Sequence, residues 1–291
     1  MPRLAGAGTQ ACRRRTVGVM TTANLSAASG WEKWADWTLE QQRPVVDWLC
    51  RSAGLAPAMT VLDLASGAGQ PAIQAAAIVG SAGRVIATDV AADMLAGCQR
   101  RARAAGVENL EFRELDMHDL RTVDDASIDA VTCGFALMFS SDPARVMSEI
   151  RRVLKPSGRF ALCVWDEPAK NPFFTTMFGA IAQVVPQPAP RPDAPGPFRL
   201  AAPGDLERLI RAGGFLEVAV EPVPFVFEFE SLEQHWEINR DMAAPLKRAA
   251  TTLPSADVAR LRSVLADALA PYTEAGRVRL LATALCAAGR R

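Results

Sequence analysis

The stretch VLDLASGAGQPA, at residues 61–72, constrains the fold of this chain more than any other. Its first residues are mostly apolar and predict a buried strand, and Gly67 and Gly69 then predict a tight turn. A helix is expected next, over residues 71–79. Gly67, Gly69 and Ala72 also fit a loose pattern of nucleotide-binding folds, in which a strand runs through a glycine turn into a helix.

Strands and helices continue to alternate after this unit. Strands are expected at residues 61–65, 84–89, 110–116, 129–135 and 159–166, and helices at 71–79, 91–105 and 143–154. Alternation of this kind is typical of parallel strands joined by helical crossovers. The chain is therefore predicted to be an α/β protein with helices on both faces of a parallel sheet.

The regions around this core are expected to form a lid and a cap. The expected segments are a disordered tail at 1–23, an N-terminal helical lid at 24–54, the α/β core at 55–166, a cap insertion with a proline-rich connection at 167–203, a core helix and strand at 204–230, a helical cap insertion at 231–272 and a final strand at 273–291. Trp31, Trp34 and Trp37 have the three-residue spacing of one helical face. The first residues are basic, and Met20 is an alternative start.

Composition narrows the possible partners. Lys and Arg total 32, and Asp and Glu also total 32, so the net charge of zero argues against a nucleic-acid partner. No run approaches the roughly 18 apolar residues that span a bilayer, so we expect no integral membrane segment. The 6 cysteines are scattered and include no C-x-x-C pair, which indicates reduced thiols, no metal site and a cytoplasmic protein. We expect a monomer or a homodimer.

Two classes of enzyme use a strand, a glycine turn and a helix in this order: nicotinamide-dependent oxidoreductases and S-adenosylmethionine (SAM)-dependent methyltransferases. Asp89 ends the second strand 20 residues after Gly69, where a carboxylate can accept hydrogen bonds from both ribose hydroxyls, but both classes share that feature. Asp116 ends the third strand beside Met117 and suits an adenine amine held against an apolar wall. A short-chain reductase would need a Tyr-x-x-x-Lys pair, and the single tyrosine, Tyr272, has no such lysine. These features favour SAM.

Residues 61–165 resemble the class I SAM-dependent methyltransferases, in particular the group of ubiquinone/menaquinone C-methyltransferases and small-molecule methyltransferases. The segments that carry the resemblance are VLDLASGAG, RVIATDVAADML, ELDMHDL, DAVTCGFAL and RVLKPSGRFALCVWD. The resemblance implies a Rossmann-like, seven-stranded, mostly parallel sheet whose last strand is antiparallel, with an added helical cap. It also implies SAM as cofactor and S-adenosylhomocysteine (SAH) as product. Ala65 departs from the family, which more often has glycine at that place.

The resemblance also implies a set of cofactor-binding residues. They are Trp34, Asp63, Ala65, Ser66, Gly67, Gly69, Gln70, Asp89, Val90, Met94, Asp116, Met117, His118, Cys133, Gly134 and Phe135. Several of them have a structural alternative. Asp116 alone can cap a helix, Phe135 can pack in the core, and a tryptophan face on a helix is more often core than ligand contact.

Methyl transfer from a sulfonium is an in-line displacement, and a base is needed only if the acceptor must lose a proton. The candidate catalytic residues are His235, Asp166 and His118. A helical histidine is more often solvated or packed than catalytic, and Asp166 can instead cap the turn that follows it. The sequence therefore leaves O-, C- and N-methylation open, with O- or C-methylation favoured.

The two cap insertions carry apolar side chains that suit a small, largely apolar acceptor in a closed pocket. They are Phe173, Phe174, Met177, Phe178, Ile181, Trp236, Ile238, Met242 and Leu246. Two other functions remain open. The chain can bind SAM without transferring a methyl group, as a regulatory or other non-methylating protein, or it can be an NAD(P)-dependent oxidoreductase.

Overall fold

The computed structural model describes residues 28–186 and 194–291, so the tail expected at 1–23 lies outside the described residues. One sheet runs through the molecule in the strand order β3-β2-β1-β4-β5-β8-β6, and β7 pairs with β8. The strands are β1 (Thr60–Leu64), β2 (Arg84–Asp89), β3 (Leu110–Glu114), β4 (Ile128–Gly134), β5 (Leu154–Trp165), β6 (Leu216–Phe229), β7 (Thr273–Glu274) and β8 (Arg277–Arg290). The first five are parallel, and β8 is antiparallel to both of its long neighbours. The expected sheet is confirmed, with the short β7 added.

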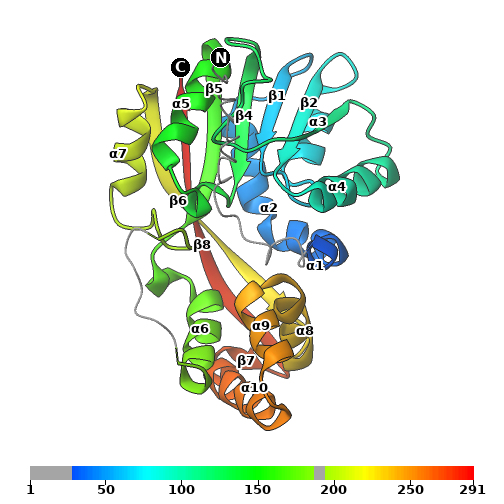
Figure 1. Cartoon of the computed structure of the whole chain (residues 1–291), viewed down its shortest axis with the longest axis vertical. Helices are drawn as coiled ribbons and strands as arrows, with labels where there is room; N and C mark the ends of the chain where they lie inside the picture. Colours follow the sequence, from blue (N-terminus) through cyan, green and yellow to red (C-terminus); the bar gives the residue numbers. More distant parts are fainter. Residues whose placement is uncertain (1–27, 187–193) are drawn as a thin grey trace, which may run out of the picture.

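Helices cover both faces of the sheet (Figure 1). They are α1 (Ala28–Lys33), α2 (Ala35–Ser52), α3 (Ala72–Val79), α4 (Ala92–Ala104), α5 (Pro143–Val153), α6 (Pro172–Val184), α7 (Asp205–Ala212), α8 (Leu232–Met242), α9 (Ala244–Thr252) and α10 (Ser255–Leu269). The crossovers through α3 and α5 run in opposite directions along the sheet. Because such crossovers are right-handed, these two helices lie on opposite faces. Among the described residues, no helix combines the length and apolar character needed to cross a membrane.

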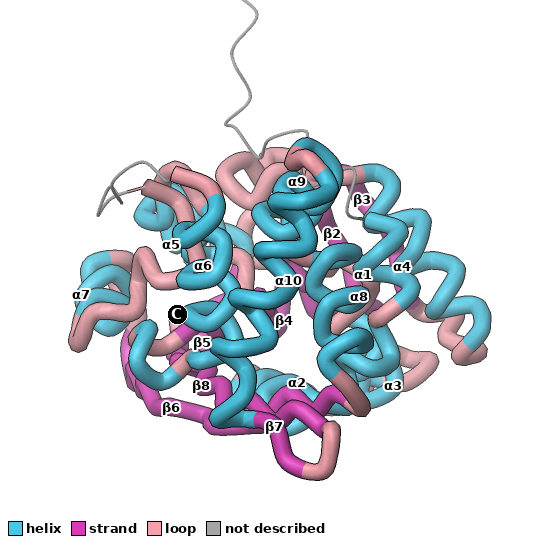
Figure 2. Tube along the Cα trace, turned by 90° about the horizontal axis from the view of Figure 1, so that it is seen from below, coloured by secondary structure: helices cyan, strands magenta, loops and turns pink. Residues whose placement is uncertain are grey.

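The long strands β6 and β8 continue beyond the core into a second group of helices (Figure 1). This group, which we call the cap, consists of α6, α8, α9 and α10, with α6 packed on α10 and α8 on α9. Figure 2 shows α1 beside α8 at the junction between core and cap. The core and the cap are thus joined by continuous strands as well as by helix contacts.

Two of the expected helical segments are interrupted. The N-terminal helical lid is broken at Trp34, between α1 and α2, so its tryptophan face is not one continuous stripe. The cap insertion is broken between α8 and α9 at Ala243, which has an extended backbone with φ −91° and ψ 107°. Pro245 explains this break, because in a continuous helix its ring would clash with the carbonyl of Asp241. The third strand also ends earlier than expected, at Glu114, and leaves Asp116 in the loop.

The junction between α1 and α8 centres on Asp241. Its Oδ2 accepts a hydrogen bond from the Trp34 indole at 3.0 Å and lies 2.9 Å from the Lys33 ammonium. Gly30 lies against the same residue, and a Cβ atom built on Gly30 would fall far inside van der Waals contact of the Asp241 carbonyl. The two helices therefore pack closely only because residue 30 has no side chain.

We expect Gly30→Ala to separate α1 from α8. The added methyl group meets backbone that cannot rotate away, so the free energy of unfolding should fall by about 1–3 kcal/mol. Hydrogen exchange should become faster in residues 28–40 and 232–242, while β5 stays protected. Gly179→Ala in α6 is the matched control, because a Cβ there meets nothing within 4 Å among the described residues. That control should stabilise the protein by about 0.5–1 kcal/mol, and equal behaviour of the two variants would contradict the described packing.

Candidate active site

The turn after β1 is shaped by residues with positive φ. Ala65, Gly67 and Gly69 have φ values of 52°, 52° and 107°. A Cβ built on Gly67 meets nothing within 4 Å among the described residues, whereas one on Gly69 would lie 2.7 Å from Ile73 Cδ1. Glycine is thus favoured at position 69 by its φ of 107°, and Gly67 leaves space beside the turn that a ligand can fill.

Asp63 lies beneath this turn, fully buried at 0% exposure. Its Oδ1 accepts a hydrogen bond from Thr132 Oγ1 at 2.6 Å, and its backbone carbonyl accepts one from Thr88 Oγ1 at 2.9 Å. Its Oδ2 has no hydrogen-bond partner among the described residues. Burial raises the pKa of Asp63 to about 7. A buried carboxylate oxygen without a partner is costly and is suited to a ligand that brings a cation or a donor.

Asp89 ends β2 next to the same turn. Its Oδ2 accepts the Gly67 N–H at 3.0 Å, and its Oδ1 accepts the Ala91 N–H at 3.0 Å. Burial also raises the pKa of Asp89 above its ordinary value. Ser66 completes the link between the turn and β2, because its backbone N–H donates to the Thr88 carbonyl at 2.7 Å. The structure therefore brings Asp63, Gly67 and Asp89 together at the carboxyl edge of the sheet.

Asp116 follows β3 at this edge and is bonded to His118. Asp116 Oδ1 accepts the His118 backbone N–H at 2.9 Å and lies 2.5 Å from His118 Nδ1. The other ring nitrogen, Nε2, lies 2.7 Å from Ser140 Oγ. Both nitrogens of His118 are therefore engaged inside the protein, while the second oxygen of Asp116 takes no part in these bonds. Met117, between them, is buried.

The end of β4 lies against the glycine turn. A Cβ built on Gly134 would be 3.6 Å from Pro71 Cδ, and Gln70 Nε2 donates to the Ala35 carbonyl at 2.6 Å. Phe135 has a positive φ of 51° and stacks on Trp165 with ring centroids 4.1 Å apart. The carboxyl end of β4 therefore lies close to the glycine turn, which is bonded to α2, and leads directly into the stacked rings of Phe135 and Trp165.

The remaining predicted cofactor residues differ in their surroundings. Val90 and Met94 flank the start of α4 and are half-buried. Cys133 is buried in β4, and burial raises the pKa of its thiol well above the ordinary range, which keeps it protonated. Trp34 belongs to the junction with α8 through its bond to Asp241. Among the described residues, no hydrogen bond joins the Trp34 side chain to the glycine turn.

Asp166 and His235 have opposite environments. Asp166 Oδ1 accepts the Glu167 N–H at 2.7 Å and Oδ2 lies 3.0 Å from the Lys170 ammonium, so its carboxylate is engaged in the turn after β5. His235 is fully buried on α8, and neither ring nitrogen has a hydrogen-bond partner among the described residues. Burial lowers the pKa of His235 to about 4. Only His235 of the three catalytic candidates has both of its polar atoms free of hydrogen bonds to the described residues.

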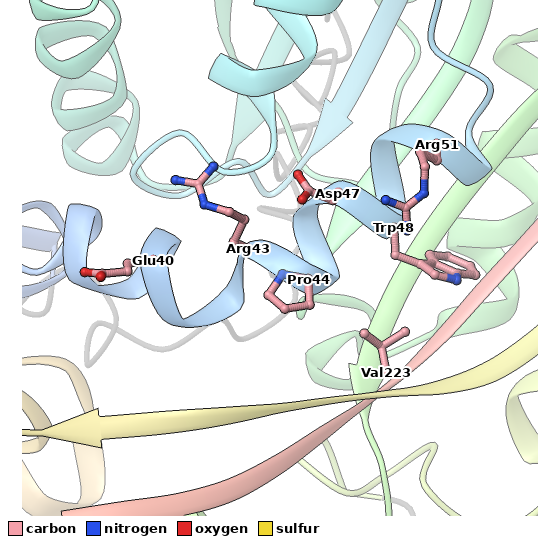
Figure 3. A pocket seen from close by; sticks show the side chains of 7 residues that line it. All are labelled: Glu40, Arg43, Pro44, Asp47, Trp48, Arg51 and Val223. Atoms are coloured by element: carbon pink, nitrogen blue, oxygen red, sulfur yellow. The ribbon is translucent and has the colours of Figure 1, made fainter.

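Two surface hollows lie along α2. One of about 570 Å³ is lined by charged and apolar side chains of α2 and by Val223 of β6 (Figure 3). No residue of the glycine turn lines it. Several aromatic side chains that were expected to line an acceptor pocket pack against other rings. The ring centroids of Phe173 and Phe227, for example, are 4.2 Å apart.

Sequence reasoning missed the threonine and serine partners of the site. Thr88 in β2 and Thr132 in β4 donate hydrogen bonds to Asp63. Because β-branched residues are common in strands, neither threonine stands out in the sequence as a site residue. Ser140, the partner of His118, lies 22 residues away in the chain. A threonine within an otherwise apolar strand is the signal that could have found the first two.

The fold and the three carboxylates define a class of protein. Parallel strands in the order β3-β2-β1-β4-β5, continued by β8 and β6, with acids in or after β1, β2 and β3, are the architecture of the class I SAM-dependent methyltransferases. Residues 55–184 match the family described as "Methyltransferase domain". Residues 55–184 of this chain are therefore similar to that family of methyltransferase domains.

Known proteins agree with this class. The chain is 34% identical over 142 residues to the 2-phytyl-1,4-naphtoquinone methyltransferase of Trichormus variabilis, which covers 48% of this chain and 62% of that protein. The YcgJ protein of Bacillus subtilis has a similar fold, with a TM-score of 0.55 and 19% identity. The match covers 84% of this chain and 97% of that protein. A SAM-dependent methyltransferase from Aquifex aeolicus is similar with a TM-score of 0.51 and 21% identity. That match covers 68% of this chain and 92% of that protein. The chain thus spans less than two thirds of the quinone methyltransferase.

Proposed function

We propose that this protein is an enzyme that transfers a methyl group from SAM to a small, largely apolar acceptor and releases SAH. The buried Oδ2 of Asp63, which has no hydrogen-bond partner among the described residues, carries the proposal, together with the space beside Gly67 in the turn that follows β1. A ligand with an ammonium group at one end would meet both needs of this site, since it would supply the missing charge and fill the space beside the turn.

Two further carboxylates would hold the other parts of the cofactor. Asp89 would accept hydrogen bonds from the ribose hydroxyls, since it lies at the end of β2 with one oxygen on the glycine turn and the other on the backbone at the start of α4. The free oxygen of Asp116 would accept from the adenine amine, with His118 holding the carboxylate in place. Because His118 and Asp166 are engaged in the protein, we assign them positioning rather than proton transfer.

The cofactor supplies a methyl group that is already activated as a sulfonium. The protein then has to hold the acceptor in line and exclude water, which the aromatic side chains between core and cap would do. The similarity to a quinone methyltransferase supports an apolar acceptor that is methylated on oxygen or carbon. We further propose a cytoplasmic monomer or homodimer that does not bind nucleic acid.

Calorimetric titration tests the cofactor directly. We expect SAM and SAH to bind the full chain, with no detectable heat from NAD or NADP. Methyl-labelled SAM incubated with the enzyme and a panel of phenols and quinols should then transfer label to at least one of them. Tight binding of NADH, or SAH binding without label transfer to any acceptor including cell extract, would contradict the proposal.

A further inference from the structure

His235 is unusual among the buried polar residues of this protein. It lies on α8 at 0% exposure, and both ring nitrogens lack a hydrogen-bond partner among the described residues. Its ring meets Phe229 edge to face, with centroids 4.7 Å apart. A buried donor and acceptor without partners destabilise the fold, and an apolar ring of similar size would avoid that cost. The polar atoms of this ring therefore need an explanation outside the packing of the cap.

A continuous line of aromatic rings connects His235 with the glycine turn. Phe135 stacks on Trp165, and the ring centroids of Trp165 and Phe227 are 6.3 Å apart. The ring centroids of Phe227 and Phe229 are 6.5 Å apart, and Phe229 contacts His235. The line starts beside Gly134, which approaches Pro71 of the glycine turn, and ends at α8 of the cap. His235 thus closes, on the cap side, an aromatic region that begins at the proposed cofactor site.

Side chains from several elements widen this region into a layer of rings. The ring centroid of Trp37 in α2 is 5.0 Å from that of Phe229, and the ring centroid of Phe173 in α6 is 4.2 Å from that of Phe227. Flat apolar surfaces of this kind favour a planar aromatic guest, because ring faces and edges attract one another. In this layer the indole rings of Trp37 and Trp165 have only an N–H donor, whereas the imidazole of His235 has both a donor and an acceptor.

We propose that His235 binds the methyl acceptor and selects a planar aromatic molecule that carries a hydroxyl group. This inference rests on the proposed function and deepens it by naming the acceptor class. The neutral imidazole has one N–H donor and one bare nitrogen, so it can accept the hydroxyl proton or donate to the hydroxyl oxygen. Because burial keeps the ring uncharged, a neutral hydroxyl suits it better than a carboxylate, which would be buried without a counter-charge. His235 is assigned to binding and selectivity.

Binding of 2-naphthol and naphthalene to the full chain saturated with SAH tests this assignment. The two probes differ by one hydroxyl group, and we expect the wild type to bind 2-naphthol about ten-fold more tightly. His235→Phe keeps a ring of similar size and should bind both probes equally. It should also bind SAH as the wild type does and melt at the same or a higher temperature, because it removes two buried polar atoms without partners.

Glu233→Gln is the matched control on the same helix. Glu233 is exposed and forms an ion pair with Arg262. This variant should keep the preference for 2-naphthol. A preference that survives in His235→Phe, or that is absent from the wild type, overturns the inference. Failure of SAH to bind would instead count against the proposed function, and the probe preference can then be measured without SAH.

Discussion

Asp89→Ala should weaken the binding of SAM by about 1.5–3 kcal/mol, which corresponds to roughly 10- to 150-fold in affinity. In the ligand-free protein, this carboxylate accepts the backbone N–H groups of Gly67 and Ala91. The same oxygens lie at the strand end where ribose hydroxyls are expected. The substitution therefore removes acceptors for the ligand and also loosens the turn beside it.

Two further variants separate these effects. Asp89→Asn retains one acceptor oxygen and should lose less affinity than Asp89→Ala. Asp124 is an exposed acid, and Asp124→Ala should leave SAM affinity unchanged. Titration calorimetry with SAM and SAH gives the affinities, and thermal melting shows whether each variant folds. Unchanged affinity in Asp89→Ala would mean that the carboxylate only holds the turn.

The stability of the ligand-free protein should depend on pH through Asp63. Its pKa is raised from 3.8 to about 7 by burial, so the folded state favours the protonated acid. That contribution is fully present below pH of about 4 and is lost as pH rises through about 7, with a slope of at most about 1.4 kcal/mol per pH unit. An ammonium group near Asp63 Oδ2 would reverse the preference, so SAM binding should strengthen over the same range and release protons.

Asp63→Asn is the test of this dependence, because an amide of the same shape does not titrate. The slope of unfolding free energy between pH 4 and 7 should be smaller in this variant than in the wild type. The remaining slope belongs to other acids, including Asp89, whose pKa is also raised. Proton release is measured by calorimetry in two buffers of different ionisation enthalpy. Equal proton release in wild type and variant would mean that Asp63 does not sense the cofactor.

The core of the fold could be predicted because its rules are local. Short apolar runs separated by turns and helices specify a parallel sheet, and the glycine turn fixes where the first strand ends. Since the carboxyl ends of parallel strands share one edge, Asp63, Asp89 and Asp116 could be expected near one another. Their partners could not be expected, because Thr132 and Ser140 reach the site only through tertiary packing.

The cap shows where sequence patterns become insufficient. The break at Trp34 depends on tertiary contacts that periodicity does not contain, whereas the break at Ala243 follows from Pro245, a local signal in the sequence. Trp34 bonds to Asp241, which is 207 residues away in the chain. The burial of His235 likewise follows from the packing of α8 on β6 and α1. A helical pattern gives the face of a residue but not what will cover it.

The order of strands also governs how the protein can fold while it is being synthesised. The parallel strands β3, β2, β1, β4 and β5 can pair once residue 165 has left the ribosome. In contrast, β6 joins the sheet only through β8, which lies between it and β5. The strand at residues 216–229 and the cap helices that follow must therefore wait for residues 277–290 before they dock. Until then the nascent chain exposes the edge of β5, where a chaperone would find its binding surface.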